Sequence, residues 1–184
     1  MVDPDADEEE IKTQIRQVYL DTDFDEPKAI DWDLLNKGVR KLKNLDPFNS
    51  PVYDSSQMIR QAETEHIKPS QVLIIEGHLI FCNPELMKLM DLKVFIDTDD
   101  DVRLSRRVLK MSRARPDDKT YLADLLLSYE QKVKPNFEKY IEPTKKYADI
   151  IVPNYGFSTE DNLEIDKMNI PAIDLIINRV LSEQ

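Results

Sequence analysis

Residues Gln71–Gly77 read QVLIIEG, a run of four apolar residues that is closed by an acid and a glycine. The run does not alternate apolar with polar side chains, and this pattern is typical of a strand buried on both faces. In open α/β sheets, ligands bind outside the carboxyl ends of the strands. We therefore predict a buried strand over 72–76 that delivers the carboxylate of Glu76 to a site.

Two further apolar runs, KVFIDT (93–98) and ADIIVP (148–153), have the same character, and helical patterns lie between and after them. This order predicts an α/β protein with a parallel sheet and right-handed crossovers. The polar stretch 57–68 is compatible with a strand, a helix or a lid, and 45–56 with a loop or a small β excursion. Helices are expected over 32–43 with Asp31 as cap, from Asn83 and Pro84 to about Asp91, over the basic stretch 99–115, from Asp117 or Asp118 onward, and from Asn169 and Pro171.

The composition excludes several classes of function. A net charge of −11 over 184 residues disfavours nucleic acid or an anionic membrane as a partner. The single cysteine, Cys82, allows neither an internal disulfide nor a thiolate metal cluster, and a packed thiol fits a reducing compartment. No apolar run approaches the ~20 residues of a membrane span, and the acidic start is unlike a signal peptide. The expected location is cytoplasmic.

Glycine is scarce, since Gly38, Gly77 and Gly156 are the only three in the chain. No two of them are spaced as in the phosphate loops G-x-x-x-x-G-K-[ST] or G-x-G-x-x-G. Those loops need glycine because their backbone approaches phosphate closely. The 184 residues therefore contain no glycine-rich phosphate loop.

Glu76 and the basic stretch 99–115 are the first candidates for chemistry. Glu76 is either a magnesium ligand, or a charge that orients metal-bound water, or a strand-end acid that caps the next turn. The basic stretch is either a clamp for nucleotide phosphates or an exposed helix paired with neighbouring acids. Its six cations stand out in so acidic a chain, and they are Arg103, Arg106, Arg107, Lys110, Arg113 and Arg115.

Asp25, Tyr53 and Arg60 form a second group of candidates. An acid, an aromatic ring and a cation on loops can bind a polar ring and a sugar, although ordinary surface residues have the same types. His66 and His78 show no metal-ligand spacing, so we expect both to be structural.

Several longer stretches resemble the uridine–cytidine kinases of the phosphoribulokinase/uridine kinase family, from about Phe24 to Leu181. The stretches are FDEPKAID (24–31), PVYD (51–54), VLIIEGHLIF (72–81), VFIDTDDDVRLSRRVLK (94–110) and VKPNFEKYIEPTKKYADIIVP (133–153). The resemblance implies a P-loop NTPase fold, that is, a parallel sheet in a three-layer arrangement. It implies transfer of the γ-phosphoryl group of ATP, with Mg²⁺, to the 5′-hydroxyl of a pyrimidine nucleoside in pyrimidine salvage.

The resemblance also implies roles for individual residues. Asp25 would hold ribose hydroxyls, Tyr53 would line the base pocket, and Glu76 would serve the magnesium site. Arg60 is predicted only as a further substrate-binding residue. Met58 stands where the family has a histidine, which puts the selectivity for pyrimidines in question because a thioether cannot replace imidazole hydrogen bonds. Three further residues would face the phosphates, namely Arg107, Lys110 and, in a lid at about 110–120, Arg115.

The lid and the helix after it also depart from the family. Pro116 and Asp117 follow Arg115 where the lid normally carries a glycine flanked by arginines, and Ser128 replaces a glutamine.

The front of the family pattern is not found in these 184 residues. Family members begin with a strand, the phosphate loop and a helix, and a second strand then delivers the aspartate that acts as base. We therefore expect an incomplete sheet that lacks the first strand, the P-loop and the first helix. The missing strand belongs between 72–76 and 93–98, so the chain is expected to be part of a longer protein with a P-loop upstream, to repack, or to accept a partner strand.

Three functions follow as hypotheses. The chain is a uridine/cytidine kinase that is inactive in this 184-residue form, a non-catalytic kinase-like binding or assembly module, or a kinase for another small alcohol or riboside. Residues 1–20 are expected to form an acidic N-terminal extension or helix, and 21–184 a partial uridine kinase-like domain. The expected partners are a nucleoside, a nucleotide and, in addition, a homo-oligomer or a complementing subunit.

Overall fold

The computed structural model describes residues 7, 10, 13–14, 17, 22–54, 59–114, 121–154 and 171–182. The chain divides into two compact units, Met1–Leu89 and Met90–Gln184. Most of the predicted N-terminal extension lies outside the described residues, as do Met58, Arg115 and the lid residues 115–120. The domain boundary near residue 20 stays a prediction.

Helix α2 (Trp32–Lys43) of the first unit has the bounds that the sequence predicts. The side chain of Asp31 caps it, because Oδ1 accepts a hydrogen bond from the Leu34 amide at 3.1 Å. Val39 and Leu42 are buried on its inner face. Gly38 is buried there as well, and a side chain at this position would meet the ring of Phe48 at 2.7 Å. The absence of a side chain at Gly38 thus allows α2 to approach the neighbouring strand.

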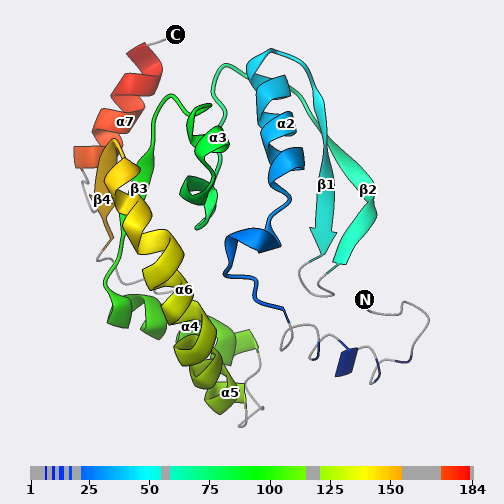
Figure 1. Ribbon diagram of the computed structural model, residues 1–184. Coiled ribbons are helices and arrows are strands. Elements are labelled where there is room, and N and C mark those ends of the chain that lie inside the picture. The colour runs from blue at the N-terminus through cyan, green and yellow to red at the C-terminus, as the bar shows by residue number, and fades with distance from the viewer. Residues whose placement is uncertain are drawn as a thin grey trace. The chain divides into compact units, whose positions relative to one another are not determined.

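Strands β1 (Phe48–Asp54) and β2 (Ile59–Ile67) form an antiparallel hairpin beside α2 (Figure 1). The structure therefore resolves the alternatives for both stretches in favour of strands. The register is irregular between Pro51 and Tyr53, as in a β-bulge. Tyr53 is the first β1 residue after this irregularity, and it pairs with Arg60.

The rest of the first unit's core comes from the residues after Gly77. Leu79, Phe81 and Leu86 are at most 6 % exposed. Asn83 caps the short helix α3 (Pro84–Met87), since its Oδ1 accepts from the Leu86 amide at 2.8 Å. The predicted cap and the proline at the first turn are confirmed, but the helix ends four residues earlier than the expected Asp91.

The prediction of a buried strand over 72–76 is wrong. The segment has no regular secondary structure and belongs to no sheet, and Ile74 is 83 % exposed. A strand needs a neighbour for its backbone N–H and C=O groups, and among the described residues none lies alongside this segment. The apolar pattern is typical of a strand, but it does not show whether a neighbouring strand is there to pair with it.

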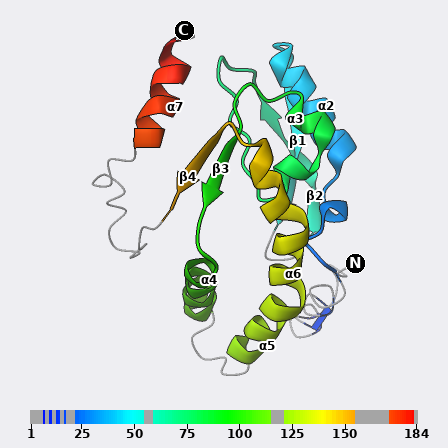
Figure 2. The same cartoon turned by 60° about the vertical axis from the view of Figure 1, so that its left-hand side comes forward.

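In the second unit, β3 (Val94–Asp97) and β4 (Ile150–Pro153) pair in parallel, as the sequence predicts. Figure 2 shows the two strands side by side. Phe95 and Val152 are buried, whereas Ile96 and Ile151 are about half exposed at 56 % and 46 %. The expectation of burial on both faces is therefore wrong for Ile96 and Ile151.

The described residues between β3 and β4 are mostly helical. The helices are α4 (Asp100–Ala114), α5 (Tyr121–Ser128) and α6 (Lys134–Asn136), the last flanked by π-helical turns at Tyr129–Val133 and Phe137–Ile141. Figure 2 shows α5 and α6 as one curved helical run. Pro135 lies inside α6 and has no N–H to donate, and the wide turns on either side allow the helix to continue past it.

Helix α7 (Pro171–Ser182) starts at the predicted proline. Its apolar residues are largely exposed, including Leu175 at 65 % and Leu181 at 57 %. Of the helices that the structure describes, none combines the length and the apolarity needed to cross a membrane. The parallel strands joined by helices define an α/β fold, as predicted.

Candidate functional site

A cavity of about 430 Å³ lies between α2, the loop before it and the hairpin, entirely within the first unit. Three aromatic side chains contribute to its wall, together with aliphatic residues and a few polar groups. Small-molecule sites commonly combine a mostly apolar lining with a few placed polar groups. The lining residues are Phe24, Ala29, Ile30, Asp31, Leu34, Leu35, Phe48, Ser50, Pro51, Tyr53 and Arg60.

The hairpin brings two predicted site residues together. Tyr53 of β1 and Arg60 of β2 are direct partners in the antiparallel register. Residues directly opposite each other project from the same face of a hairpin, and both side chains line the cavity. An aromatic ring and a guanidinium group are thus available to one ligand.

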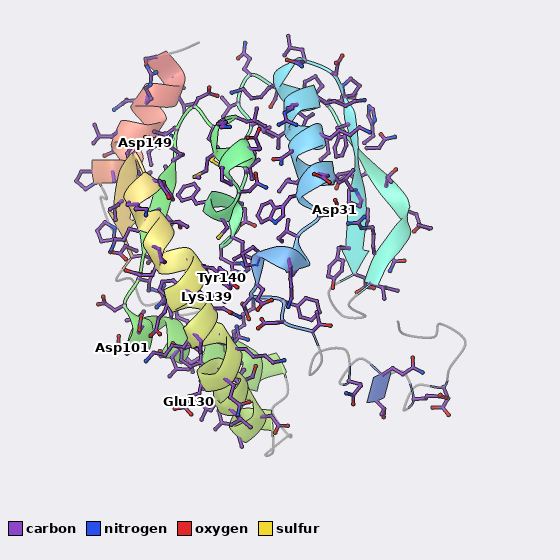
Figure 3. All side chains as sticks on the ribbon, in the orientation of Figure 1. Asp31, Asp101, Glu130, Lys139, Tyr140 and Asp149 are labelled. Atoms are coloured by element: carbon purple, nitrogen blue, oxygen red, sulfur yellow. The ribbon has the colours of Figure 1, made fainter. Side chains whose placement is uncertain are left out.

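Asp31 lies at the beginning of α2 and lines the same cavity (Figure 3). Its Oδ2 accepts hydrogen bonds from Nη1 and Nη2 of Arg60, each at 3.3 Å. The sequence predicts Asp31 only as a helix cap, so its place in the cavity is an addition from the structure. The available signal was its position at the end of FDEPKAID, the stretch that also contains Asp25.

Asp25 follows the cavity residue Phe24 and contacts a second part of the unit. Its amide donates to Oδ1 of Asp23 at 3.1 Å, which makes a tight local turn. Its own Oδ1 lies 3.7 Å from Nε2 of His78, an ion pair when the histidine is protonated. His78 was expected to be structural, and here it connects the predicted sugar-binding loop to the segment that follows Glu76.

Glu76 itself is exposed and lies in the unpaired segment. The described residues contain no group of three or more His, Cys, Asp or Glu side chains placed to hold a metal ion. Magnesium is usually held by one or two carboxylates together with substrate phosphates and water rather than by a cage of protein ligands. A single exposed carboxylate suits such a site, and the role of Glu76 in it stays a prediction.

The basic helix α4 contains cations in different environments. Arg103 stacks on the ring of Phe137, 3.4 Å from its centroid, and pairs with Asp100. Arg106 donates to Oδ1 of Asn154 at 3.4 Å. These contacts are within the second unit and stabilise its packing, so these two arginines are engaged in the fold.

Arg107 and Lys110 are the predicted phosphate-facing residues that the structure describes. Lys110 is exposed, whereas Arg107 is half-buried with its Nε hidden from solvent. That Nε has no hydrogen-bond partner among the described residues. A buried donor without a partner is costly, and a ligand oxygen would satisfy it. Met58 and Arg115 lie outside the described residues.

Comparison with known proteins agrees with the α/β fold. Residues 2–159 match the model of the phosphoribulokinase / uridine kinase family. The chain is 42 % identical over 164 residues to a uridine kinase of Latilactobacillus sakei subsp. sakei (strain 23K), an alignment that covers 88 % of this chain and 70 % of that protein. It is 39 % identical over 162 residues to a uridine kinase of Oceanobacillus iheyensis, covering 88 % and 74 %.

The α/β fold and the strong similarity over most of the chain define the class as that of P-loop NTPase-type proteins. Within it, the chain belongs to the phosphoribulokinase/uridine kinase family.

Proposed function

We propose that this chain supplies the nucleoside site of a uridine–cytidine kinase. The reaction of such a kinase moves the γ-phosphoryl group of ATP to the 5′-hydroxyl of a pyrimidine nucleoside. The cavity that contains Tyr53 and Arg60 carries the proposal, because it offers aromatic walls and polar groups for a flat base. The names of the similar proteins support it independently.

On the nucleoside side, Tyr53 stacks on the base and Arg60 donates hydrogen bonds to a carbonyl of its edge. Asp25 accepts hydrogen bonds from ribose hydroxyls, which are neutral donors that suit a half-exposed carboxylate. Met58, which stands where the family has a histidine, leaves one hydrogen bond to the base unmade and weakens the discrimination between bases.

On the phosphate side, Arg107, Lys110 and Arg115 neutralise the charge of ATP. Transfer of a phosphoryl group depends mainly on positioning and on electrostatic stabilisation, so side chains of this kind supply much of the catalysis. Glu76 would hold Mg²⁺, which neutralises charge on the phosphate oxygens when it is bound. The unpartnered Nε of Arg107 favours a place for this residue at the phosphates.

We propose further that the 184 residues alone bind a nucleoside without phosphorylating it. Their three glycines leave no G-x-x-x-x-G-K-[ST] sequence, and the β- and γ-phosphates then lack a backbone cradle and its lysine. The chain is in this respect a binding or assembly module, and activity would require a phosphate loop from a further segment of the protein or from a complementing subunit. A chain with one cysteine suits a reducing compartment such as the cytoplasm.

Isothermal titration of the chain with uridine tests the nucleoside site. We expect saturable binding, and we expect Tyr53→Ala to weaken it about 3- to 10-fold, the equivalent of a lost stacking interaction of ~0.5–1.5 kcal/mol. Tyr147→Ala removes an exposed tyrosine of the second unit and serves as the matched control. An absence of binding at millimolar uridine and cytidine contradicts the proposal, and binding of another riboside in their place favours a kinase for a different alcohol.

An assay with ATP, Mg²⁺ and uridine tests the second part. We expect no uridine monophosphate above background from the 184-residue chain. Formation of the monophosphate at an ordinary enzymatic rate of ~1–10³ s⁻¹ would show that the chain is catalytic by itself.

A further inference from the structure

We infer that Asp31 is a positioning residue for the nucleoside site, because its carboxylate holds the guanidinium of Arg60 where it meets the base. The inference rests on the proposed function and adds a residue to it. Its physical basis is the two hydrogen bonds of 3.3 Å from Nη1 and Nη2 of Arg60 to one oxygen of Asp31.

A single carboxylate performs two tasks at this position. Its Oδ1 caps α2 through the Leu34 amide at 3.1 Å, and its Oδ2 accepts from Arg60 of β2. The cap fixes the carboxylate on a regular helix, and the carboxylate in turn fixes an arginine that is otherwise long and flexible. The start of α2 thereby sets the position of a side chain that the hairpin provides.

The pair leaves Arg60 able to bind a ligand. A guanidinium has five N–H donors in a rigid fork, and two hydrogen bonds to Asp31 leave three for other acceptors. Arg60 faces Tyr53 across the hairpin, and both line the cavity. A base stacked on Tyr53 would therefore present its carbonyl oxygens to an arginine that is already oriented.

The pair also determines which ligands suit the cavity. Of the described side chains that line it, only Asp31 and Arg60 are charged, and their charges cancel. An unpaired arginine would attract phosphate, whereas a neutralised pair suits an uncharged ligand with hydrogen-bonding edges. This arrangement fits a nucleoside substrate better than a nucleotide.

Two substitutions at Asp31 separate the cap from the pair. Asp31→Asn keeps the cap, since asparagine is as good at this position, but it removes the charge that holds Arg60. We expect its Tm to stay within about 2 °C of the wild type. We expect its dissociation constant for uridine to rise about 5- to 10-fold. Asp31→Ala removes the cap as well and should lower Tm by about 2–4 °C in addition.

Asp33→Asn is the matched control, because Asp33 is an exposed acid in the first turn of the same helix that does not line the cavity. It changes the net charge and the field of the helix as Asp31→Asn does. We expect its affinity for uridine to stay within about 2-fold of the wild type, since the pair with Arg60 is intact.

Salt provides a readout that a purely structural role of Asp31 would not change. Uridine is uncharged, so salt acts on its affinity mainly through charges of the protein. Both partners of the pair are about half exposed, at 44 % and 52 %, and salt therefore screens them. We expect the wild-type affinity to fall toward that of Asp31→Asn between about 0.05 and 1 M NaCl, and the affinity of the variant to stay constant.

A double-mutant cycle with Arg60→Gln completes the experiment. We expect Asp31→Asn to add nothing further once Arg60 is gone, because Asp31 acts through Arg60. Fully additive effects, or an Asp31→Asn variant that binds uridine like the wild type, would overturn the inference and leave the proposed function intact. A wild-type chain that binds no nucleoside would contradict the proposed function, and the inference with it.

Discussion

The apolar segments 72–75 and Val94–Asp97 are similar in sequence and different in structure. VLII and VFID have nearly the same length and character, and an acid stands at or just after the end of each. The second forms β3 and pairs with β4, so that Phe95 is only 8 % exposed. The first has no regular secondary structure and is unpaired, and its Ile74 is 83 % exposed. A local pattern of this kind therefore does not decide whether a strand forms.

The difference shows that a neighbouring strand decides whether an apolar segment of this kind forms a strand. β3 pairs with Ile150–Pro153 over four residue pairs. Next to the first pair, the carboxylate of Asp149 accepts hydrogen bonds from the backbone amide and from Nζ of Lys93. β-propensity mainly measures how well a residue fits a sheet that is already there. Among the described residues, 72–76 has no such sheet beside it.

The hairpin in the first unit provides the complementary case. The sequence of β2, IRQAETEHI, is mostly polar and alone is ambiguous, yet it forms a strand because β1 is close in sequence and pairs with it. A polar segment with a partner is thus a strand, and an apolar segment without one is not.

The largest difference in stability is expected when an apolar side chain is truncated to alanine in each of the two segments. Phe95→Ala should destabilise the second unit by about 3–5 kcal/mol, since it removes a buried ring and leaves a cavity. Ile74→Ala should change the free energy of unfolding by less than about 0.5 kcal/mol, because the side chain is already in solvent. Urea unfolding of both variants, followed by circular dichroism, measures the two values.

A loss of several kcal/mol in Ile74→Ala would break the comparison, because it would mean that 72–76 is packed in solution. A small loss of stability in Phe95→Ala would also contradict the comparison, because it would mean that the ring of Phe95 in β3 is not packed. Phe95→Leu is the control for volume, and we expect it to lie between the wild type and Phe95→Ala.

An intermediate loss of stability is expected from a substitution at Gly38, which tests how closely α2 packs against the paired strands of the hairpin. An added methyl group would meet Cε1 of Phe48 at 2.7 Å and push α2 away from β1. Overpacking of about 1–3 kcal/mol should exceed the helix-propensity gain of about 1 kcal/mol, so we expect Gly38→Ala to destabilise by roughly 1 kcal/mol. Urea unfolding measures it, and uridine affinity should fall as well because Phe48 lines the cavity.

The double variant Gly38→Ala/Phe48→Leu makes room for the methyl group and should recover part of the lost stability. If Gly38→Ala were instead stabilising, as it is in an exposed helix, the close packing of α2 on the hairpin would be wrong.

The sequence predicted those parts of the fold that depend on neighbours in the chain. Helix α2 was predicted with correct ends because its cap, its apolar spacing and its last turn are all local, and Pro171 marked the start of α7 in the same way. The strand at 72–76 was predicted wrongly because its partner is not a local property. The parallel pairing of β3 and β4 was predictable only as the general arrangement of alternating strands and helices.

The candidate site shows the same limit. Tyr53 and Arg60 were predicted in one group of candidates from their residue types, and only the structure shows that they lie opposite each other in the hairpin and line one cavity. Asp31 was predicted as a helix cap because a cap depends on residues close in the chain. The hydrogen bonds from Arg60 to its second carboxylate oxygen were not predicted, because the two residues are 29 positions apart. Likewise, His78 was expected to be structural, and its proximity to Asp25 depends on tertiary folding.

The smallest effect is expected at Asp149, whose carboxylate fastens the start of the β3–β4 register (Figure 3). Its Oδ2 accepts a hydrogen bond from Nζ of Lys93 at 2.9 Å and another from the backbone amide of Lys93 at 2.7 Å, and these hydrogen bonds lower its pKa from the usual 3.8. A carboxyl group with a lowered pKa stabilises the folded state above its unfolded pKa, and this contribution disappears as pH falls through the folded value. Because the pair is exposed, we expect less than about 1 kcal/mol.

Urea midpoints measured from pH 7 to pH 2 for the wild type and Asp149→Asn test this. The variant should be slightly less stable at pH 7, and the two curves should meet below pH ~3.8, where the wild-type carboxyl also becomes neutral. Lys93→Met removes Nζ and keeps the backbone amide, so we expect it to lose only part of the pH-dependent difference. Two curves that stay parallel down to pH 2 would mean that Asp149 does not act through its charge, and that the pairing of β4 itself holds the β3–β4 register.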